Sequence, residues 1–186
     1  MRRHGFLLCG ALVSTLGACS IPLYKVAPLP KNSPMAAGQT INVNGLEVTA
    51  AALTDDDKSF ERFDTNLPLA GILVVDVKLV NRSSDTVKSL KFELRDASGK
   101  KFPLLDAKKK LKQVMKFEGV RLYPIEGRKE TLEQLQAIAL PKKLTLAAQE
   151  EKRGVLFFHT KQDVAQLKGL ILTVKGMAHS LGVPLQ

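Results

Sequence analysis

Apolar and polar residues alternate through much of the chain from residue 39 onward, and a period of two predicts strands that each bury one face. The clearest run covers residues 72–80, where Leu73, Val75, Val77 and Leu79 share one side, so we expect a central strand there. Shorter runs predict further strands at 41–43, 46–48, 90–94, 102–104, 144–146, 155–160 and 170–174. A series of short strands with frequent turns is typical of an antiparallel β-sandwich.

Turn signals separate the predicted strands. Asn44-Gly45 favours a two-residue hairpin, because both positions tolerate positive φ, and residues 81–85 and 96–100 fit tight reversals. The acidic triplet Asp55-Asp56-Asp57 is interpreted as a solvated turn, because it lacks the alternating ligands and the closing glutamate of a calcium loop. We expect a charged turn at residues 149–153 and an irregular C-terminal tail at residues 177–186.

Residues 106–140 form a lysine-rich insertion with a different pattern. Asp106 can cap a helix with an apolar stripe that includes Met115, but the same sequence also fits a hairpin across Glu118-Gly119, and both alternatives remain open. Residues 131–140 combine a capping box with a helical stripe that a proline ends. The expected fold is therefore mainly β, with one or two short helices inserted between strands.

The N-terminus has the parts of a secretory signal: Arg2 and Arg3 form a basic start, and residues 5–16 are apolar. Twelve apolar residues are too few for a membrane-spanning helix, which needs roughly 18 or more. The sequence Leu16-Gly17-Ala18-Cys19 resembles the lipobox of bacterial lipoproteins. This resemblance implies that residues 1–18 are a lipoprotein signal peptide, and that the thiol and the new amine of Cys19 carry covalent lipid.

Residues 19–38 are then the lipidated cysteine and a tether with prolines at positions 22, 28, 30 and 34. Two or three acyl chains anchor a protein stably, since each buried methylene contributes about 0.8 kcal/mol. Ser20 stands where an aspartate would signal retention in the inner membrane of enterobacteria-like systems. The resemblance therefore implies an outer-membrane anchor in the cell envelope, with the domain of residues 39–176 facing the periplasm.

The side chains available for catalysis are few. Cys9 leaves with the signal and Cys19 carries lipid, so no intramolecular disulfide is possible in the mature chain. His159 and His179 remain, but no His-Glu-x-x-His or Gly-x-Ser-x-Gly motif is present. Ser98-x-x-Lys101 matches a serine–lysine motif, yet it falls in a predicted hairpin rather than at a helix start. We expect no enzymatic activity, no metal and no cofactor apart from the covalent lipid.

Charge favours anionic partners. Removing residues 1–18 takes Arg2 and Arg3 and no acid from 28 basic and 18 acidic side chains, so the mature chain has a formal charge of +8. The densest basic run, our candidate surface for an anionic partner, is Lys108, Lys109, Lys110 and Lys112, although most such runs are solvated faces without a ligand. No aromatic residues interleave with these lysines as stacking platforms, so we expect no nucleic-acid partner.

Three segments carry a resemblance to a known family: residues 71–84, residues 92–102 with an Asp-x-x-Gly turn, and residues 152–158. Together they are similar to an immunoglobulin-like domain of unknown function found in bacterial lipoproteins and secreted proteins. The resemblance covers about residues 39–175, and the insertion at 106–140 departs from it. It implies an immunoglobulin-like antiparallel β-sandwich without catalytic residues.

These patterns lead to two functional hypotheses. The first is a membrane-anchored, non-enzymatic envelope lipoprotein that presents a basic surface to an anionic envelope component or an envelope protein. The second is a structural accessory subunit of a cell-envelope complex, bound through a strand edge or the 106–140 segment. Salt distinguishes them, because screening weakens exposed charge contacts and leaves an apolar interface intact.

Overall fold

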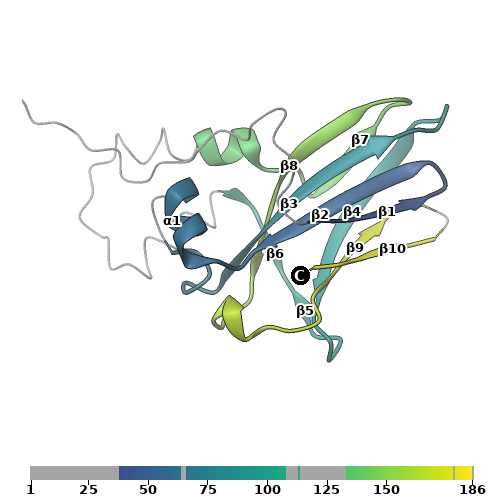
Figure 1. Cartoon of the computed structure of the whole chain (residues 1–186). Helices are drawn as coiled ribbons and strands as arrows, with labels where there is room; N and C mark the ends of the chain where they lie inside the picture. Colours follow the sequence, from purple (N-terminus) through teal and green to yellow (C-terminus); the bar gives the residue numbers. More distant parts are fainter. Residues whose placement is uncertain (1–37, 64–65, 108–112, 114–132, 178, 186) are drawn as a thin grey trace, which may run out of the picture.

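The computed structural model describes residues 38–63, 66–107, 113, 133–177 and 179–185. Two antiparallel sheets make up most of this part of the chain (Figure 1). The first sheet has the order β1-β2-β3-β8-β6, with bounds Gln39–Val43, Leu46–Leu53, Ile72–Asn81, Glu151–His159 and Leu104–Leu105. The second has the order β10-β9-β4-β5, with bounds Leu181–Pro184, Ile171–Lys175, Val87–Arg95 and Lys101–Phe102. Strand β7, Lys143–Leu146, also pairs with β4.

The two sheets face each other across one core, which confirms the predicted mainly-β sandwich. The side chains that fill it alternate along their strands, as in Leu73, Val75 and Val77 of β3 and Leu90, Phe92 and Leu94 of β4. Apolar residues of β2, β5, β7, β8, β9 and β10, and several from the loops beside them, complete the cluster. Alternation therefore leaves the intervening residues of β4 and β9 on the outer face of the second sheet.

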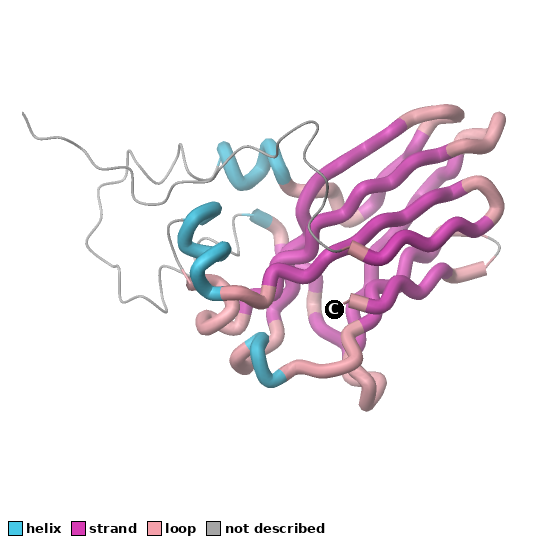
Figure 2. The backbone as a smooth tube through the Cα atoms, in the orientation of Figure 1, coloured by secondary structure: helices cyan, strands magenta, loops and turns pink. Residues whose placement is uncertain are grey.

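A second apolar cluster covers the outer face of the first sheet. Helix α1, Asp56–Phe63, and the helical residues 133–138 pack Phe63 and Leu135 onto Val155 and Phe157. The rings of Phe63 and Phe157 meet edge to face with centroids 6.2 Å apart. Figure 2 shows the helices gathered at one end of the sandwich. Strands β3 and β8 are thus buried on both faces near that end, which explains their nearly continuous apolar sequence.

Several predicted local structures are confirmed. The β1–β2 hairpin turns at Asn44 and Gly45, which have φ of 52° and 79°, and pairs Val43 with Leu46. Strand β3 is central, with β2 on one side and β8 on the other. Residues 133–138 are helical as expected, whereas the capping-box threonine and most of 106–132 lie outside the described residues.

Other predictions were wrong. The acidic triplet is not a plain turn: Asp56 and Asp57 form the first turn of helix α1, and the carboxylate of Asp55, just before the helix, accepts a hydrogen bond from the Lys58 backbone N–H over 3.0 Å. Strand β8 already begins at Glu151, so the expected charged turn at 149–153 is shorter. Phe102 and Leu104 fall in different sheets, because the chain crosses between them at Pro103.

The expected irregular tail at 177–186 is also wrong. Residues Leu181–Pro184 form strand β10, which pairs with β9 in the register Leu181 with Val174 and Val183 with Leu172. Leu181 and Val183 are buried in the main core. Without β10, the edge of β9 and the adjoining core side chains would be exposed to water. The domain therefore extends beyond residue 176 to the buried Leu185.

The buried amide of Asn81 links the two sheets by hydrogen bonds at the end opposite the helices. Its Nδ2 donates to the backbone oxygens of Asp85 at 2.7 Å and Ala147 at 2.8 Å. Its Oδ1 accepts from the backbone N–H and the hydroxyl of Ser83, at 3.1 and 2.7 Å. Asn81 ends β3 and Ala147 follows β7, so one fully buried side chain joins loops that leave different sheets.

We predict that Asn81→Ala lowers the free energy of unfolding by about 3 kcal/mol, because several buried polar groups lose their partners together. Asn81→Asp should cost at least as much, since a carboxylate oxygen would face carbonyl oxygens where the amide now donates. Urea unfolding measures both, with the exposed Asn42→Ala on β1 as the matched control. Equal stability of the Asn81 and Asn42 variants would contradict this role for the amide.

Candidate functional site

The outer face of the second sheet carries a cluster of cations. Lys91 of β4 lies opposite Lys143 of β7 on one side and opposite Lys175 of β9 on the other. Arg95 of β4 lies opposite Lys101 of β5. Because residues directly opposite each other in antiparallel strands point to the same face, all five cations lie on the outer face. We call this surface the basic face: Lys91, Arg95, Lys101, Lys143 and Lys175, with Glu93 among them.

Glu93 is the acid that holds part of the basic face in place. Its carboxylate accepts from Arg95 Nε at 2.6 Å, Lys175 Nζ at 3.0 Å and Lys101 Nζ at 3.1 Å. The Glu93 side chain is only 19% exposed, although its partners reach into solvent. One carboxylate therefore fixes three cations on three neighbouring strands.

These contacts shift the acidity of Glu93. The hydrogen bond from Lys175 lowers the pKa most, those from Arg95 and Lys101 lower it further, and partial burial opposes them. The pKa of Glu93 falls from 4.5 to about 2. Glu93 is therefore ionised throughout the neutral range, and the basic face keeps five cations against one anion.

Lys91 and Lys143 are the cations most open to a ligand. Within the described ranges neither makes an ion pair, while they lie directly opposite each other. Like charges opposite each other in a sheet are destabilising, so an anion placed between them would relieve repulsion. The row Lys143, Lys91, Lys175 crosses three strands spaced by about 4.8 Å, so it offers charge over roughly 10 Å.

The residues predicted from the sequence to carry function lie elsewhere. Cys19 and the run Lys108, Lys109, Lys110 and Lys112 are outside the described residues, so their predictions stay predictions. The basic face was missed because its members come from positions 91 to 175 and form no run. Strand alternation could have found Lys91 and Arg95 on one face of β4, but only the register brings in Lys143 and Lys175.

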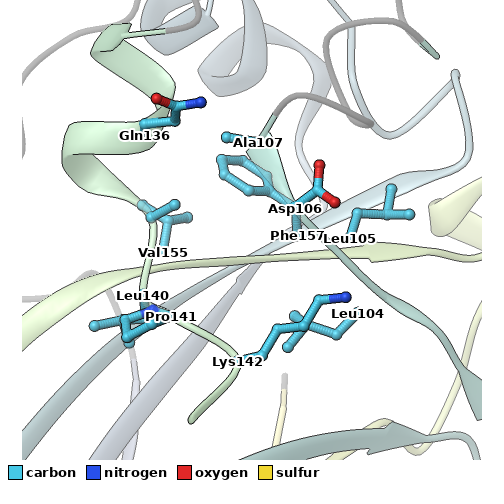
Figure 3. A pocket seen from close by; sticks show the side chains of 11 residues that line it. Leu104, Leu105, Asp106, Ala107, Gln136, Leu140, Pro141, Lys142, Val155 and Phe157 are labelled. Atoms are coloured by element: carbon cyan, nitrogen blue, oxygen red, sulfur yellow. The ribbon is translucent and has the colours of Figure 1, made fainter. Parts of the chain in front are cut away.

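A cavity of about 590 Å³ opens beside the first sheet (Figure 3). Its lining is mainly apolar and includes Leu104, Leu140 and Phe157, while Asp106 and Lys142 bring charges to it. The described parts of the 106–140 insertion, at both of its ends, border the cavity. A cavity of this size suits a small apolar ligand or a partner side chain, because ligand pockets span about 300–1,000 Å³.

The residues considered for catalysis are held in structural contacts. Ser98 Oγ donates to Asp96 Oδ1 at 2.6 Å, whereas Lys101 pairs with Glu93, so the serine–lysine motif is not assembled. His159 ends β8, and its backbone N–H donates to the Pro103 carbonyl. Partial burial, helped by Lys161, lowers the pKa of His159 and favours its neutral form.

Within the described ranges, no group of three or more His, Cys, Asp or Glu side chains comes together to hold a metal ion. Over the same part of the chain, no helix is long and apolar enough to cross a membrane.

The fold and surface define a mainly-β antiparallel sandwich with a basic outer face. No protein-family model matches the chain, and no curated protein sequence matches it. Among solved structures it is similar to the yjhA protein from Bacillus subtilis, with 14% identity, a TM-score of 0.43, and 80% of this chain and 96% of that one covered. A conserved hypothetical protein from Bacillus anthracis gives 13% identity, a TM-score of 0.37, and coverage of 78% and 92%.

We predict that Glu93→Gln lowers the free energy of unfolding at neutral pH by roughly 1 kcal/mol, since each exposed ion pair contributes a few tenths. Because the folded pKa of about 2 lies below the ordinary 4.5, the contribution of Glu93 is complete above pH 4.5 and is lost as pH falls through 2. Melting temperatures of both proteins between neutral pH and pH 2 should therefore converge toward the acid end. A difference that stays constant would contradict the depressed pKa.

Proposed function

We propose that this protein is a membrane-anchored, non-enzymatic lipoprotein of the cell envelope, and that its sandwich binds an anionic envelope component. The observation that carries the binding role is the basic face, where five cations surround Glu93. Lys91 and Lys143 have no ion-pair partner among the described side chains. They lie directly opposite each other, and the repulsion between their charges destabilises the sheet. A ligand that supplies anions offsets this repulsion.

The anchor is proposed from the sequence Leu16-Gly17-Ala18-Cys19. In this proposal lipid on Cys19 joins the bilayer to β1 through residues 20–38, which span about 25 Å as a coil and up to about 60 Å when extended. Ser20 favours the outer membrane, with the sandwich in the periplasm. The domain would then remain close enough to contact the lipid headgroups of the periplasmic leaflet and peptidoglycan.

A second candidate function has its own support. The cavity beside β6 and β8 is bordered by both ends of the 106–140 insertion, and its lining is mainly apolar. An apolar side chain of an envelope protein fits such a cavity, which favours an accessory subunit of an envelope complex. The two candidates use different surfaces: the cavity is lined by β6 and β8 of the first sheet and by residues 139–142, whereas the basic face lies on the second sheet and includes Lys143, the residue after Lys142.

The anchor is tested with the full chain expressed in a Gram-negative host. We expect the wild type in the outer-membrane fraction. Its mass should equal that of the chain beginning at Cys19 plus two or three acyl chains. Cys19→Ser should remove the lipid mass and the membrane association of the processed protein, while the neighbouring Ser20→Ala keeps both. A wild-type protein without lipid mass would contradict the anchor.

The basic face is tested by sedimentation of the unlipidated chain Ser20–Gln186 with peptidoglycan sacculi, lipopolysaccharide and anionic vesicles at low and high salt. Both core clusters lie within this piece. We expect salt-sensitive binding to at least one of these, and we expect Lys91→Gln/Lys143→Gln to weaken it about tenfold or more, because lost phosphate-type contacts reduce affinity. Glu93→Gln should strengthen it by freeing three cations.

The matched control is Lys58→Gln/Lys161→Gln, which removes two exposed lysines outside the basic face. Equal loss of binding in both double variants would mean that net charge, and not this surface, is responsible. Binding that resists salt and both double variants would favour the apolar cavity and the accessory-subunit function instead.

A further inference from the structure

We propose that the basic face docks the sandwich flat onto an anionic phospholipid bilayer, with the side chain of Ile171 entering the interface. This inference rests on the proposed function and names its partner. It adds two things to that function: a lipid surface as the anionic component, and an apolar contact beside the charges.

Ile171 is the first reason to choose a lipid surface. It lies on the outer face of the second sheet, opposite Arg95 of β4 on one side and Pro184 of β10 on the other. Its side chain is 41% exposed, although an isoleucine of a sheet is usually buried. Cations around an exposed apolar side chain are typical of surfaces that lie in the membrane interface, where the apolar group enters and the cations meet headgroups. A hydrophilic polymer offers no such environment to Ile171.

The shape of the surface is the second reason. The basic face is the outside of a sheet, with cations on four strands, and the cavity found in the described chain lies on the other sheet. Polymer chains are usually held in grooves, whereas an open face lets many headgroups approach at once. Each lysine or arginine near an anionic bilayer contributes about a fivefold gain in affinity.

The position of the proposed tether is the third reason. Gln39 begins β1, which is an edge strand of the first sheet, and β1 packs beside β10, the edge strand of the second sheet. The tether would thus join the sandwich at the border of the sheet that carries the basic face. A short tether gives an effective concentration in the millimolar range, so weak binding by the face is enough to orient the domain. Helix α1, which covers the outer face of the first sheet, then points away from the bilayer.

The chain contains no tryptophan, so a single introduced indole reports on its own surroundings. We would compare Ile171→Trp with Phe60→Trp. Phe60 is 52% exposed and belongs to helix α1, which covers the first sheet and not the basic face. Both would be made in the chain Ser20–Gln186 and mixed with vesicles of phosphatidylcholine alone or with phosphatidylglycerol. We expect a blue shift and quenching by brominated acyl chains for Trp at 171 with anionic vesicles, and neither effect at 60.

Two further variants measure affinity for the same vesicles. Lys91→Gln/Lys143→Gln should weaken binding about 25-fold, the product of two fivefold losses. Ile171→Ser should weaken binding by a similar factor at low and at high salt, because screening does not change the apolar contact. The loss caused by the lysine double variant should shrink at high salt, because screening weakens the charge contacts. Circular dichroism and melting temperature establish that each variant remains folded.

The outcomes separate this inference from the proposed function. Binding to sacculi or lipopolysaccharide without binding to anionic vesicles overturns the bilayer inference and keeps the proposed function. Vesicle binding with no shift at position 171, or with an equal shift at position 60, also overturns the inference, because the sandwich would not lie on its basic face. Failure to bind any of the three overturns both.

Discussion

The two sheets of this sandwich are buried to different extents, and the rest of the molecule follows from that asymmetry. The first sheet is covered on both faces near one end, because Phe63 and Leu135 pack on Phe157 while Phe158 points into the main core. The second sheet has its core face covered by the first, and its outer residues are left to solvent. Surface chemistry on strands β4 and β9 is therefore not constrained by packing, and charged residues can collect there.

Repulsion between the cations of the basic face destabilises the second sheet, and the carboxylate of Glu93 reduces that repulsion. Lysines directly opposite one another repel, yet the strands also need Leu90, Phe92 and Leu94 on their inner side, so the outer residues share one face whatever their charge. Glu93 binds three cations and leaves Lys91 and Lys143 unpaired among the described residues. Partial neutralisation keeps the sheet stable and the remaining charge available to an anion.

Sequence reasoning found the features that depend on neighbouring residues. Asn44-Gly45 identified a hairpin because positive φ is a local requirement, and residues 72–80 identified a central strand because their alternation is long. Helix α1 was missed because it has only eight residues and begins in an acidic triplet. Strand β10 was missed because glycine and proline occupy two of its four positions. The basic face needed the register between strands, which no local pattern contains.

Asn81 and the basic face lie on parts of the fold that depend on each other. The amide of Asn81 holds the loop after β3 against the loop after β7, and so fixes where β7 lies beside β4. Lys143 belongs to β7 and reaches the row with Lys91 through that pairing. A buried hydrogen-bond network at one end of the sandwich thus supports the strand pairing that brings the two lysines together. The same network that stabilises this end of the fold therefore also supports the geometry of the basic face.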